Sequence, residues 1–135
     1  MHYTIQPIIL CGGNGSRLWP LSKAKLPKQF IEIEDGKTML ECTIDRISSL
    51  QQNLATKTCF DLGTKSYTVK MPLLVMHKSH SLPSSLSAYQ KNVIYEEYSN
   101  DTGVAITRAI LHMVAIGDQA DIVIVLPSDH YISNN

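Results

Sequence analysis

The sequence lacks an excess of charge of either sign. Its 135 residues include 12 Lys and Arg and 12 Asp and Glu, for a formal net charge of zero. Proteins that bind nucleic acid or membrane surfaces through charge usually show a clear basic excess. Long hydrophobic runs are also missing, since the run from Ile122 to Pro127 has six residues, whereas roughly 20 are needed to span a bilayer. We therefore expect neither a nucleic-acid partner nor a membrane partner.

Cysteine is scarce as well. Cys11, Cys42 and Cys59 are odd in number, far apart and without a Cys-x-x-Cys pair, so they predict neither a disulfide framework nor a thiolate zinc site. The stretch from Met1 to Gln6 has no basic region followed by a long apolar segment, as a secretory signal would. Together these features lead us to expect a cytoplasmic protein.

What the chain does contain is enough apolar material for one core. Hydrophobic residues make up 44% and charged residues 18%, a composition that excludes a disordered tail. Globular domains are commonly about 100–150 residues long. We therefore expect residues 1–135 to form a single domain.

Continuous apolar runs predict four strands, over residues 5–11, 73–76, 92–95 and 122–126. Strands that are apolar throughout, rather than at alternate positions, are typical of a parallel sheet covered on both faces. Helices between such strands indicate an α/β sheet built of right-handed crossovers.

Amphipathic periodicity predicts helices over residues 38–50 and 102–116, and more weakly over 84–91. Segment 51–70 lacks periodicity, and we expect it to be a long connection or a small β-excursion. In the second helix, the face expected to pack on the sheet carries Val104, Ala105, Ala109, Ile110 or Leu111, and Val114.

A glycine-rich loop follows the first predicted strand, with glycines at Gly12, Gly13 and Gly15. Open α/β sheets bind ligands just past the carboxyl ends of their strands. Glycines let the backbone approach a ligand and direct its N–H groups at phosphate oxygens, and Arg17 adds a planar cation suited to phosphate. A dinucleotide fingerprint would need glycine where Leu18 stands, and a Walker A lysine is absent from the sequence. The glycines alone also suit a plain strand-to-helix turn.

Basic residues cluster directly after this loop. Between Arg17 and Lys28 the chain also carries Lys23 and Lys25, and no acidic residue. Such a cluster beside a glycine loop favours a polyphosphate ligand. A solvated basic loop is the plainer alternative, and it suits Lys23 and Lys25 better than Arg17 and Lys28, which apolar or proline residues flank.

Three motifs resemble one family. They read GGNGSRLWPLS over residues 12–22, PKQF over 27–30 and LPSDH over 126–130. Together they resemble the signature of mannose-1-phosphate guanylyltransferases, which belong to the sugar-nucleotide pyrophosphorylase, or nucleotidyltransferase, superfamily. The resemblance implies a Rossmann-like α/β fold with a mainly parallel sheet and helices on both faces. It extends to the N-terminal nucleotide-binding half only, so we expect a truncated nucleotidyltransferase fold.

The resemblance also implies roles for individual residues. Lys28 matches the lysine beside the reacting phosphates, and Asp129 matches the aspartate that coordinates Mg²⁺. Judged by its place after an apolar strand, Asp129 is also compatible with a helix cap or turn. The family's glycine loop holds the nucleoside triphosphate, a role that the resemblance carries onto Gly12, Gly13, Gly15, Ser16 and Arg17.

The segment that reads the base in this family is only partly matched. Glu96 and Thr102 agree with the pattern, whereas Asn100 and Asp101 stand where the family has arginine and asparagine. The resemblance thus implies nucleotide-binding roles for Glu96 and Thr102. Asp101 or Thr102 also suits the N-cap of the following helix.

The implied activity is that of an Mg²⁺-dependent enzyme, converting GTP and mannose 1-phosphate into GDP-mannose and pyrophosphate. Arg17 and Lys28 would be catalytic, with Arg17 on the departing phosphates and Lys28 near the α-phosphate. Other hypotheses stay open: a nucleotide-binding remnant, one piece of a split enzyme with a complementary chain, a regulatory module, or a homo-oligomer. An exposed apolar surface near residues 122–135 would favour the split enzyme.

Overall fold

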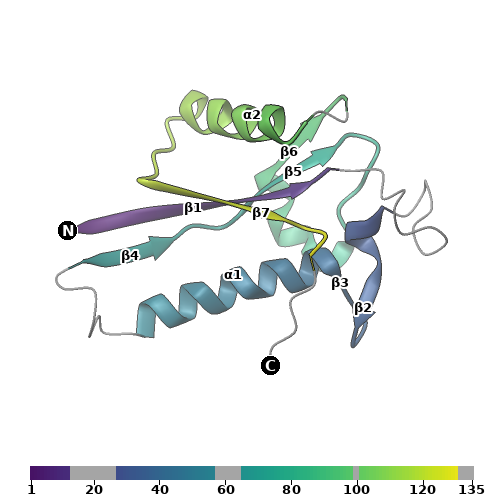
Figure 1. Ribbon diagram of the computed structural model, residues 1–135, viewed down its shortest axis with the longest axis horizontal. Coiled ribbons are helices and arrows are strands. Elements are labelled where there is room, and N and C mark those ends of the chain that lie inside the picture. Colours follow the sequence, from purple (N-terminus) through teal and green to yellow (C-terminus); the bar gives the residue numbers. More distant parts are fainter. Residues whose placement is uncertain (13–26, 57–64, 99–100, 131–135) are drawn as a thin grey trace.

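The computed structural model in Figure 1 describes residues 1–12, 27–56, 65–98 and 101–130. Within these ranges, no helix is both long and apolar enough to cross a membrane. In chain order the elements, with η marking 3-10 helices, are β1 (His2–Cys11), η2 (Lys28–Phe30), β2 (Glu32–Glu34), β3 (Lys37–Thr38), α1 (Met39–Thr56), β4 (Ser66–Val69), β5 (Leu73–His77), η3 (Ser84–Asn92), β6 (Val93–Glu96), α2 (Thr102–Ala115) and β7 (Ile122–Pro127).

Strand β1 is the centre of the main sheet. It pairs with β7 along one edge, and with β4 and then β5 along the other, while β6 lies beyond β5. All of these pairings are parallel, which confirms the predicted sheet type. The carboxyl ends of β1, β5, β6 and β7 therefore lie along one edge of the sheet.

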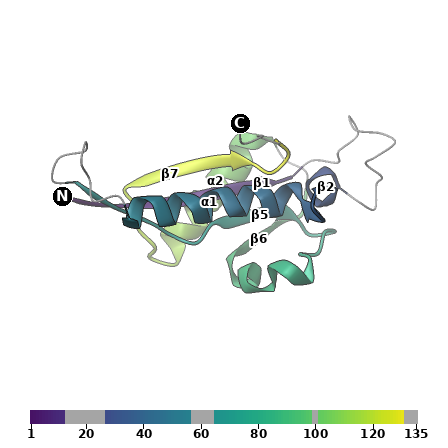
Figure 2. The ribbon, with the colours of Figure 1, turned by 90° about the horizontal axis from the view of Figure 1, so that it is seen from below.

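Helices cover both faces of the sheet, as predicted, with α1 on one side and α2 on the other (Figures 1 and 2). The α1 face holds a core built around Ile9, Leu40, Ile44 and Met76, to which Leu86 of η3 is added. The α2 face holds a smaller core, composed of Ile8, Leu73, Val75, Ile94, Ala105, Ala109 and Met113.

The buried stripe of α2 differs from the predicted one. Ala105, Ala109 and Met113 are buried, whereas Val104 and Val114 are exposed. The two alanines share one face at i, i+4 spacing, and they have only small side chains to place between helix and sheet. Larger apolar residues of α2 are left in solvent.

Helix α1 begins with a capping box. The Thr38 backbone N–H donates to Glu41 Oε2 at 2.7 Å, and the Glu41 N–H donates to Thr38 Oγ1 at 3.2 Å. These reciprocal bonds satisfy two N–H groups that a helix start would otherwise leave unpaired. Thr38, which we predicted as the first helical residue, is thus the cap.

The predicted end of this helix at Leu50 is wrong, since α1 continues to Thr56. Leu54 continues the apolar stripe onto the core. Gln51, although polar, donates from Nε2 to the carbonyls of Val69 at 3.0 Å and Lys70 at 3.3 Å. Part of the segment expected to be a connection or β-excursion is therefore helix, and part is strand β4.

Two further elements differ from the prediction. The hairpin of β2 and β3 was not predicted, although its Asp35-Gly36 turn, with φ of 49° and 75°, is a known hairpin signal. The weak helix expected over residues 84–91 is a 3-10 helix, η3, interrupted by non-helical angles at Leu86.

The capping box generates a pH-dependent prediction. Hydrogen bonds from Ser85 and then Thr38 hold the pKa of Glu41 below its ordinary value of 4.5. Since the pKa is lower in the folded state, the stabilisation is complete above the unfolded pKa and is lost as pH falls through the folded one. Glu41→Gln keeps a hydrogen-bond acceptor but removes the charge, and we expect it to cost about 0.5–1 kcal/mol at pH 7. This difference in stability from the unaltered chain should narrow as the pH falls below the ordinary pKa of 4.5.

Urea unfolding from pH 7 to pH 3 would measure this difference. The exposed Glu97→Gln is the control, expected to change the free energy of unfolding by less than about 0.5 kcal/mol. A gap for Glu41→Gln that stays constant across this range would show that the carboxylate charge contributes nothing.

Candidate functional site

The candidate site lies past the carboxyl ends of β1 and β7, which are held together by Ser128. Its backbone N–H and its Oγ both donate to the carbonyl of Leu10, at 3.2 Å and 2.7 Å. Ser128 is buried, so these bonds are shielded from water. They fix the point at which the chain leaves β7, and hence the position of Asp129.

A second buried polar residue ties η2 to the same strand. Gln29 donates from Nε2 to the carbonyl of Cys11 at 2.8 Å. The turn itself is closed by a bond from the Phe30 N–H to the Pro27 carbonyl at 2.9 Å. Lys28 therefore lies on a fixed turn rather than on a loose loop.

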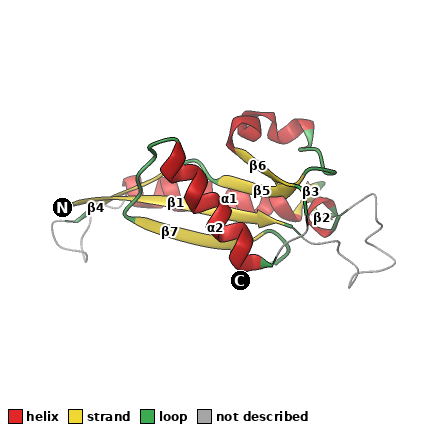
Figure 3. Cartoon of the chain, turned by 90° about the horizontal axis from the view of Figure 1, so that it is seen from above, coloured by secondary structure: helices red, strands yellow, loops and turns green. Residues whose placement is uncertain are grey.

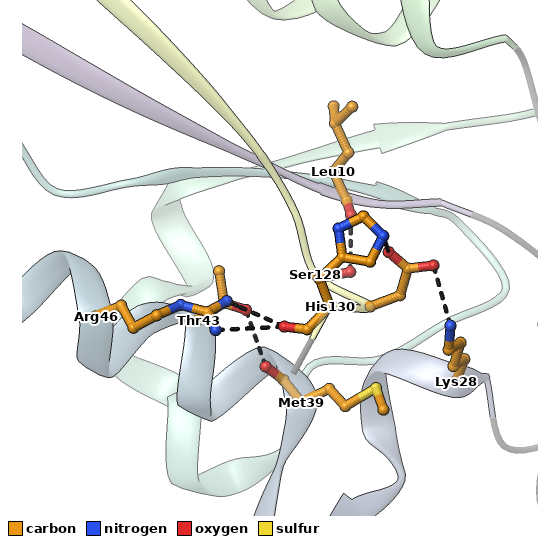
Figure 4. A network of polar contacts seen from close by, with 8 residues as sticks. Leu10, Lys28, Met39, Thr43, Arg46, Ser128 and His130 are labelled. Carbon is orange, nitrogen blue, oxygen red and sulfur yellow. Dashed lines mark hydrogen bonds and ion pairs between the residues drawn. The ribbon is translucent and has the colours of Figure 1, made fainter. Parts of the chain in front are cut away.

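These two anchors bring Lys28 and Asp129 together across 101 positions of sequence. Lys28 Nζ lies 3.4 Å from Asp129 Oδ2, with 23% and 44% of the two side chains exposed. Figure 4 shows Lys28 extending from η2 toward the end of β7. A cation and a carboxylate, adjacent and open to solvent, can receive a phosphate and a phosphate-bound metal ion.

Arg46 of α1 holds the chain on the far side of Asp129. Its guanidinium donates from Nη1 and Nη2 to the carbonyl of His130, both at 3.3 Å (Figure 4). Nη2 also donates to Thr43 Oγ1 at 2.8 Å, one turn earlier on the helix. Hydrogen bonds at Ser128 and at His130 thus fix the backbone on either side of Asp129.

Our sequence reasoning assigned no role to Gln29, Ser128 or Arg46. Gln29 and Ser128 each stand next to a predicted site residue, inside the motifs of residues 27–30 and 126–130. The signal that could have found them is a polar residue with an apolar or proline neighbour. Such a side chain can be buried, and a buried polar side chain needs a hydrogen-bond partner.

Of the predicted nucleotide-binding residues, Gly12, Glu96 and Thr102 are described. Gly13, Gly15, Ser16 and Arg17 lie outside the described residues. A Cβ built on Gly12 would meet no described atom within 4 Å. Thr102 is exposed, in the first turn of α2. The N-cap of that helix is Asp101, whose side chain makes no capping bond.

Glu96 ends β6 and lies apart from the Lys28–Asp129 pair. Three strand spacings separate β6 from β7, about 14 Å at about 4.8 Å each. The Glu96 side chain is 3% exposed, and its Oε1 is buried without a hydrogen-bond partner among the described residues. An unpaired buried carboxylate oxygen is costly unless a donor satisfies it.

Cys11 also lies at this edge, at the end of β1. Burial raises the pKa of its thiol to about 12, although a hydrogen bond with Ser128 opposes the shift. The thiol is therefore uncharged at neutral pH. It neither repels a phosphate nor acts as a nucleophile.

The residues present fit a Mg²⁺ ion carried by phosphates. In the described part of the chain, no group of three His, Cys, Asp or Glu side chains could enclose a metal. Mg²⁺ commonly binds one or two carboxylates, with substrate phosphates and water completing its shell. Asp129 would supply one such carboxylate.

The parallel sheet, its two helical layers and the polar groups at its carboxyl edge place the chain among the Rossmann-like α/β proteins. It belongs to the family described as Nucleotidyl transferase, whose model matches residues 6–135.

Several individual proteins are similar to the chain. It is 34% identical over 127 residues to an Escherichia coli mannose-1-phosphate guanylyltransferase, covering 93% of this chain and 25% of that protein. It is 32% identical over 133 residues to the alginate biosynthesis protein AlgA of Pseudomonas aeruginosa, with 95% and 24% covered. The chain therefore spans about a quarter of the length of these curated relatives.

A solved structure also matches. The crystal structure of a protein described as mannose-1-phosphate geranyltransferase, from Thermus thermophilus, aligns with a TM-score of 0.66 and 25% identity. The alignment covers 96% of this chain and 33% of that one. This agrees with the expected partial nucleotidyltransferase fold.

The Gln29 anchor generates a prediction on stability. Gln29→Met keeps the length of the side chain but leaves the Cys11 carbonyl without its donor, a loss of about 1–3 kcal/mol. Gln90→Met is the matched control, because Gln90 donates to the hydroxyl of an exposed Tyr95 rather than to a buried carbonyl. Urea unfolding of the two variants would compare them, and equal losses would contradict the role of Gln29.

Proposed function

We propose that the chain forms the nucleotide-binding part of a guanylyltransferase that makes GDP-mannose from GTP and mannose 1-phosphate. The observation that carries this proposal is the placement of Lys28 Nζ 3.4 Å from Asp129 Oδ2, at the carboxyl edge of the sheet. Membership of the Nucleotidyl transferase family and the similarity to the E. coli mannose-1-phosphate guanylyltransferase support it.

In this reaction, an oxygen of the sugar phosphate attacks the α-phosphorus of GTP and pyrophosphate leaves. Catalysis of phosphoryl transfer depends mostly on alignment and on neutralising charge. Lys28 would bind the α-phosphate oxygens, and Arg17 is predicted to bind the departing phosphates. Asp129 would hold Mg²⁺, which offsets negative charge on the triphosphate when bound. This chemistry uses no covalent protein nucleophile, in agreement with the uncharged Cys11.

The distance of about 14 Å between β7 and β6 suits a nucleotide that lies along the carboxyl edge of the sheet. With its phosphates at the ends of β1 and β7, a nucleotide would place its base toward β6 and Glu96. A carboxylate accepts hydrogen bonds only. Guanine offers N–H donors at N1 and N2 together, whereas the corresponding ring nitrogen of adenine is an acceptor. Glu96 therefore favours guanine, and Thr102 lies near enough in sequence to contribute to the same end of the site.

A second candidate function is nucleotide binding without transfer. Coverage of only about a quarter of the curated relatives favours it, because the sugar phosphate also needs a binding site. Incubation of the chain with GTP, mannose 1-phosphate and Mg²⁺ separates the two candidates. Formation of GDP-mannose would establish transfer by this chain, while GTP binding without product would establish the second function.

For Lys28, we predict that Lys28→Ala weakens Mg–GTP binding by roughly ten- to a thousandfold, because a charge-assisted contact to phosphate is lost. The control is Lys37→Ala, since Lys37 is exposed and pairs with Asp45 rather than with Asp129. Isothermal titration calorimetry would measure both. Equal effects of the two substitutions would mean that Lys28 acts only through general surface charge.

For Glu96, we predict a loss of base selectivity. Glu96→Gln replaces one acceptor oxygen with a donor amide, so GTP should bind at least about tenfold more weakly, the equivalent of about 1.4 kcal/mol, while ATP binding changes little. Titration with both nucleotides would test this, with thermal melting to check folding. An equal loss for both nucleotides would contradict a role in reading the base.

A further inference from the structure

The turn after β5 places two histidines beside the η2 turn, which carries Lys28. His77 ends β5, and the His80 N–H donates to the His77 carbonyl at 2.9 Å. The ring of His80 makes a T-shaped contact with Phe30 of η2, with 6.1 Å between the ring centres and 86° between their planes. Figure 3 shows the β2–β3 hairpin, which follows η2 in the chain, at the carboxyl end of β5. The η2 turn thus has a second support besides the bond from Gln29 to β1.

The hydrogen bonds of His77 fix its tautomer. Its Nδ1 accepts from the Ser79 backbone N–H at 3.1 Å, and the Ser79 hydroxyl lies 2.6 Å from the same atom. A backbone N–H can only donate, so Nδ1 carries no proton, and Nε2 donates to the Glu97 carbonyl at 3.0 Å. A proton added at Nδ1 would remove the acceptor of the Ser79 N–H.

His80 lies in surroundings that disfavour a positive charge. Its Nδ1 is buried and has no hydrogen-bond partner among the described residues. In a protonated ring both nitrogens carry hydrogen, so this atom would become a buried donor without an acceptor. Burial, and then the charge of His77, lower the pKa of His80 below its ordinary value of 6.5. A cation–π contact with Phe30 would favour the charged ring, so the downward shift means that burial outweighs it.

Most charged side chains on the elements around His80 are paired with other residues. Lys28 of η2 pairs with Asp129, and Lys78 pairs with Glu97 at 3.6 Å. Within the described ranges, no acidic side chain forms an ion pair with His80. The carboxylates of the neighbouring elements are Glu41, bound to Ser85 and Thr38, and Glu96, beside His77 in the sheet register.

We propose that His80 is a positioning residue for Lys28, and that its uncharged ring, packed on Phe30, holds the η2 turn in place. Protonation in mildly acidic solution puts a charge where water and acceptors are scarce, so the ring moves toward solvent and the turn loosens. Lys28 then loses its fixed position beside Asp129. The inference rests on the proposed function only for the role of Lys28 in binding phosphate.

The test compares the unaltered chain with His80→Phe, which keeps an aromatic ring but cannot take up a proton. The first readout is hydrogen exchange at the Phe30 amide, whose N–H closes the η2 turn, measured as protection relative to the intrinsic rate at each pH. Between pH 7.5 and 5.5, protection should fall about three- to tenfold in the unaltered chain, since one pKa unit corresponds to tenfold, and stay constant in His80→Phe. His112→Phe, at an exposed position of α2, is the control and should behave like the unaltered chain.

Stability should change over the same pH range. Because the pKa of His80 is lower in the folded state, the unfolded chain binds the proton first. The free energy of unfolding should therefore fall as the pH drops below the ordinary value of 6.5, and it should fall less in His80→Phe. Urea unfolding would measure this difference and confirm that each variant is folded at pH 7.5. His80→Leu serves as a second variant that cannot take up a proton.

The second readout is Mg–GTP affinity at the same two pH values, expressed as the ratio of the unaltered chain to His80→Phe. Titration of the nucleotide itself cancels from this ratio, because both proteins meet the same ligand at each pH. The ratio should fall about three- to tenfold at pH 5.5. His112→Phe should leave it unchanged.

Two results would overturn the inference. One is protection of the Phe30 amide that stays constant with pH in the unaltered chain, or that falls equally in both His80 variants. The other is a turn that loosens while the affinity ratio stays constant, which would show that Lys28 does not depend on it. A chain that binds no GTP at either pH would contradict the proposed function, and exchange at the Phe30 amide would still decide whether His80 holds the turn.

Discussion

The site depends on two carbonyl groups at the end of β1. The Leu10 carbonyl accepts hydrogen bonds from Ser128, and the Cys11 carbonyl accepts one from Gln29. Each donor stands next to a residue of the candidate site, Asp129 in one case and Lys28 in the other. Because successive carbonyls of a strand point to opposite sides, two neighbouring positions can hold two different segments of chain.

These anchors, rather than the ion pair, fix the geometry. A partly exposed pair such as Lys28–Asp129 is worth about 0–1 kcal/mol, and its 3.4 Å separation is long for a strong contact. A buried hydrogen bond to a carbonyl costs about 1–3 kcal/mol to leave unmade. Lys28 and Asp129 are therefore held by their backbones, which leaves their charged ends able to bind a ligand instead of each other.

Much of the architecture could be predicted from the sequence. Apolar runs located β1, β5, β6 and β7, and apolar spacing located both α-helices, because burial on a sheet imposes these patterns. The end of α1 could not be predicted, since the side chain of Gln51 bonds carbonyls that are distant in sequence. The buried stripe of α2 was missed because helical periodicity does not show that small alanines, rather than larger aliphatic residues, face the sheet.

The same limits apply to the site. The motifs identified Lys28 and Asp129 but not the residues that hold them, because a positioning role depends on which carbonyl lies within reach. Gln29 reaches Cys11 over 18 positions, Ser128 reaches Leu10 over 118, and Arg46 reaches His130 over 84. No local pattern encodes such pairings, which depend on how β1, β7, η2 and α1 are arranged in the fold.

Strand β7 carries one half of the candidate site. Ile124 and Leu126 of this strand pack against the α1 core, and its last residue leads directly into Ser128 and Asp129. Among the described elements it is held in the sheet by β1 alone, so the position of Asp129 depends on a strand that is supported on one side. The hydrogen bonds from Ser128 to the Leu10 carbonyl, at the end of that strand, therefore do most to fix the carboxylate proposed to bind the metal.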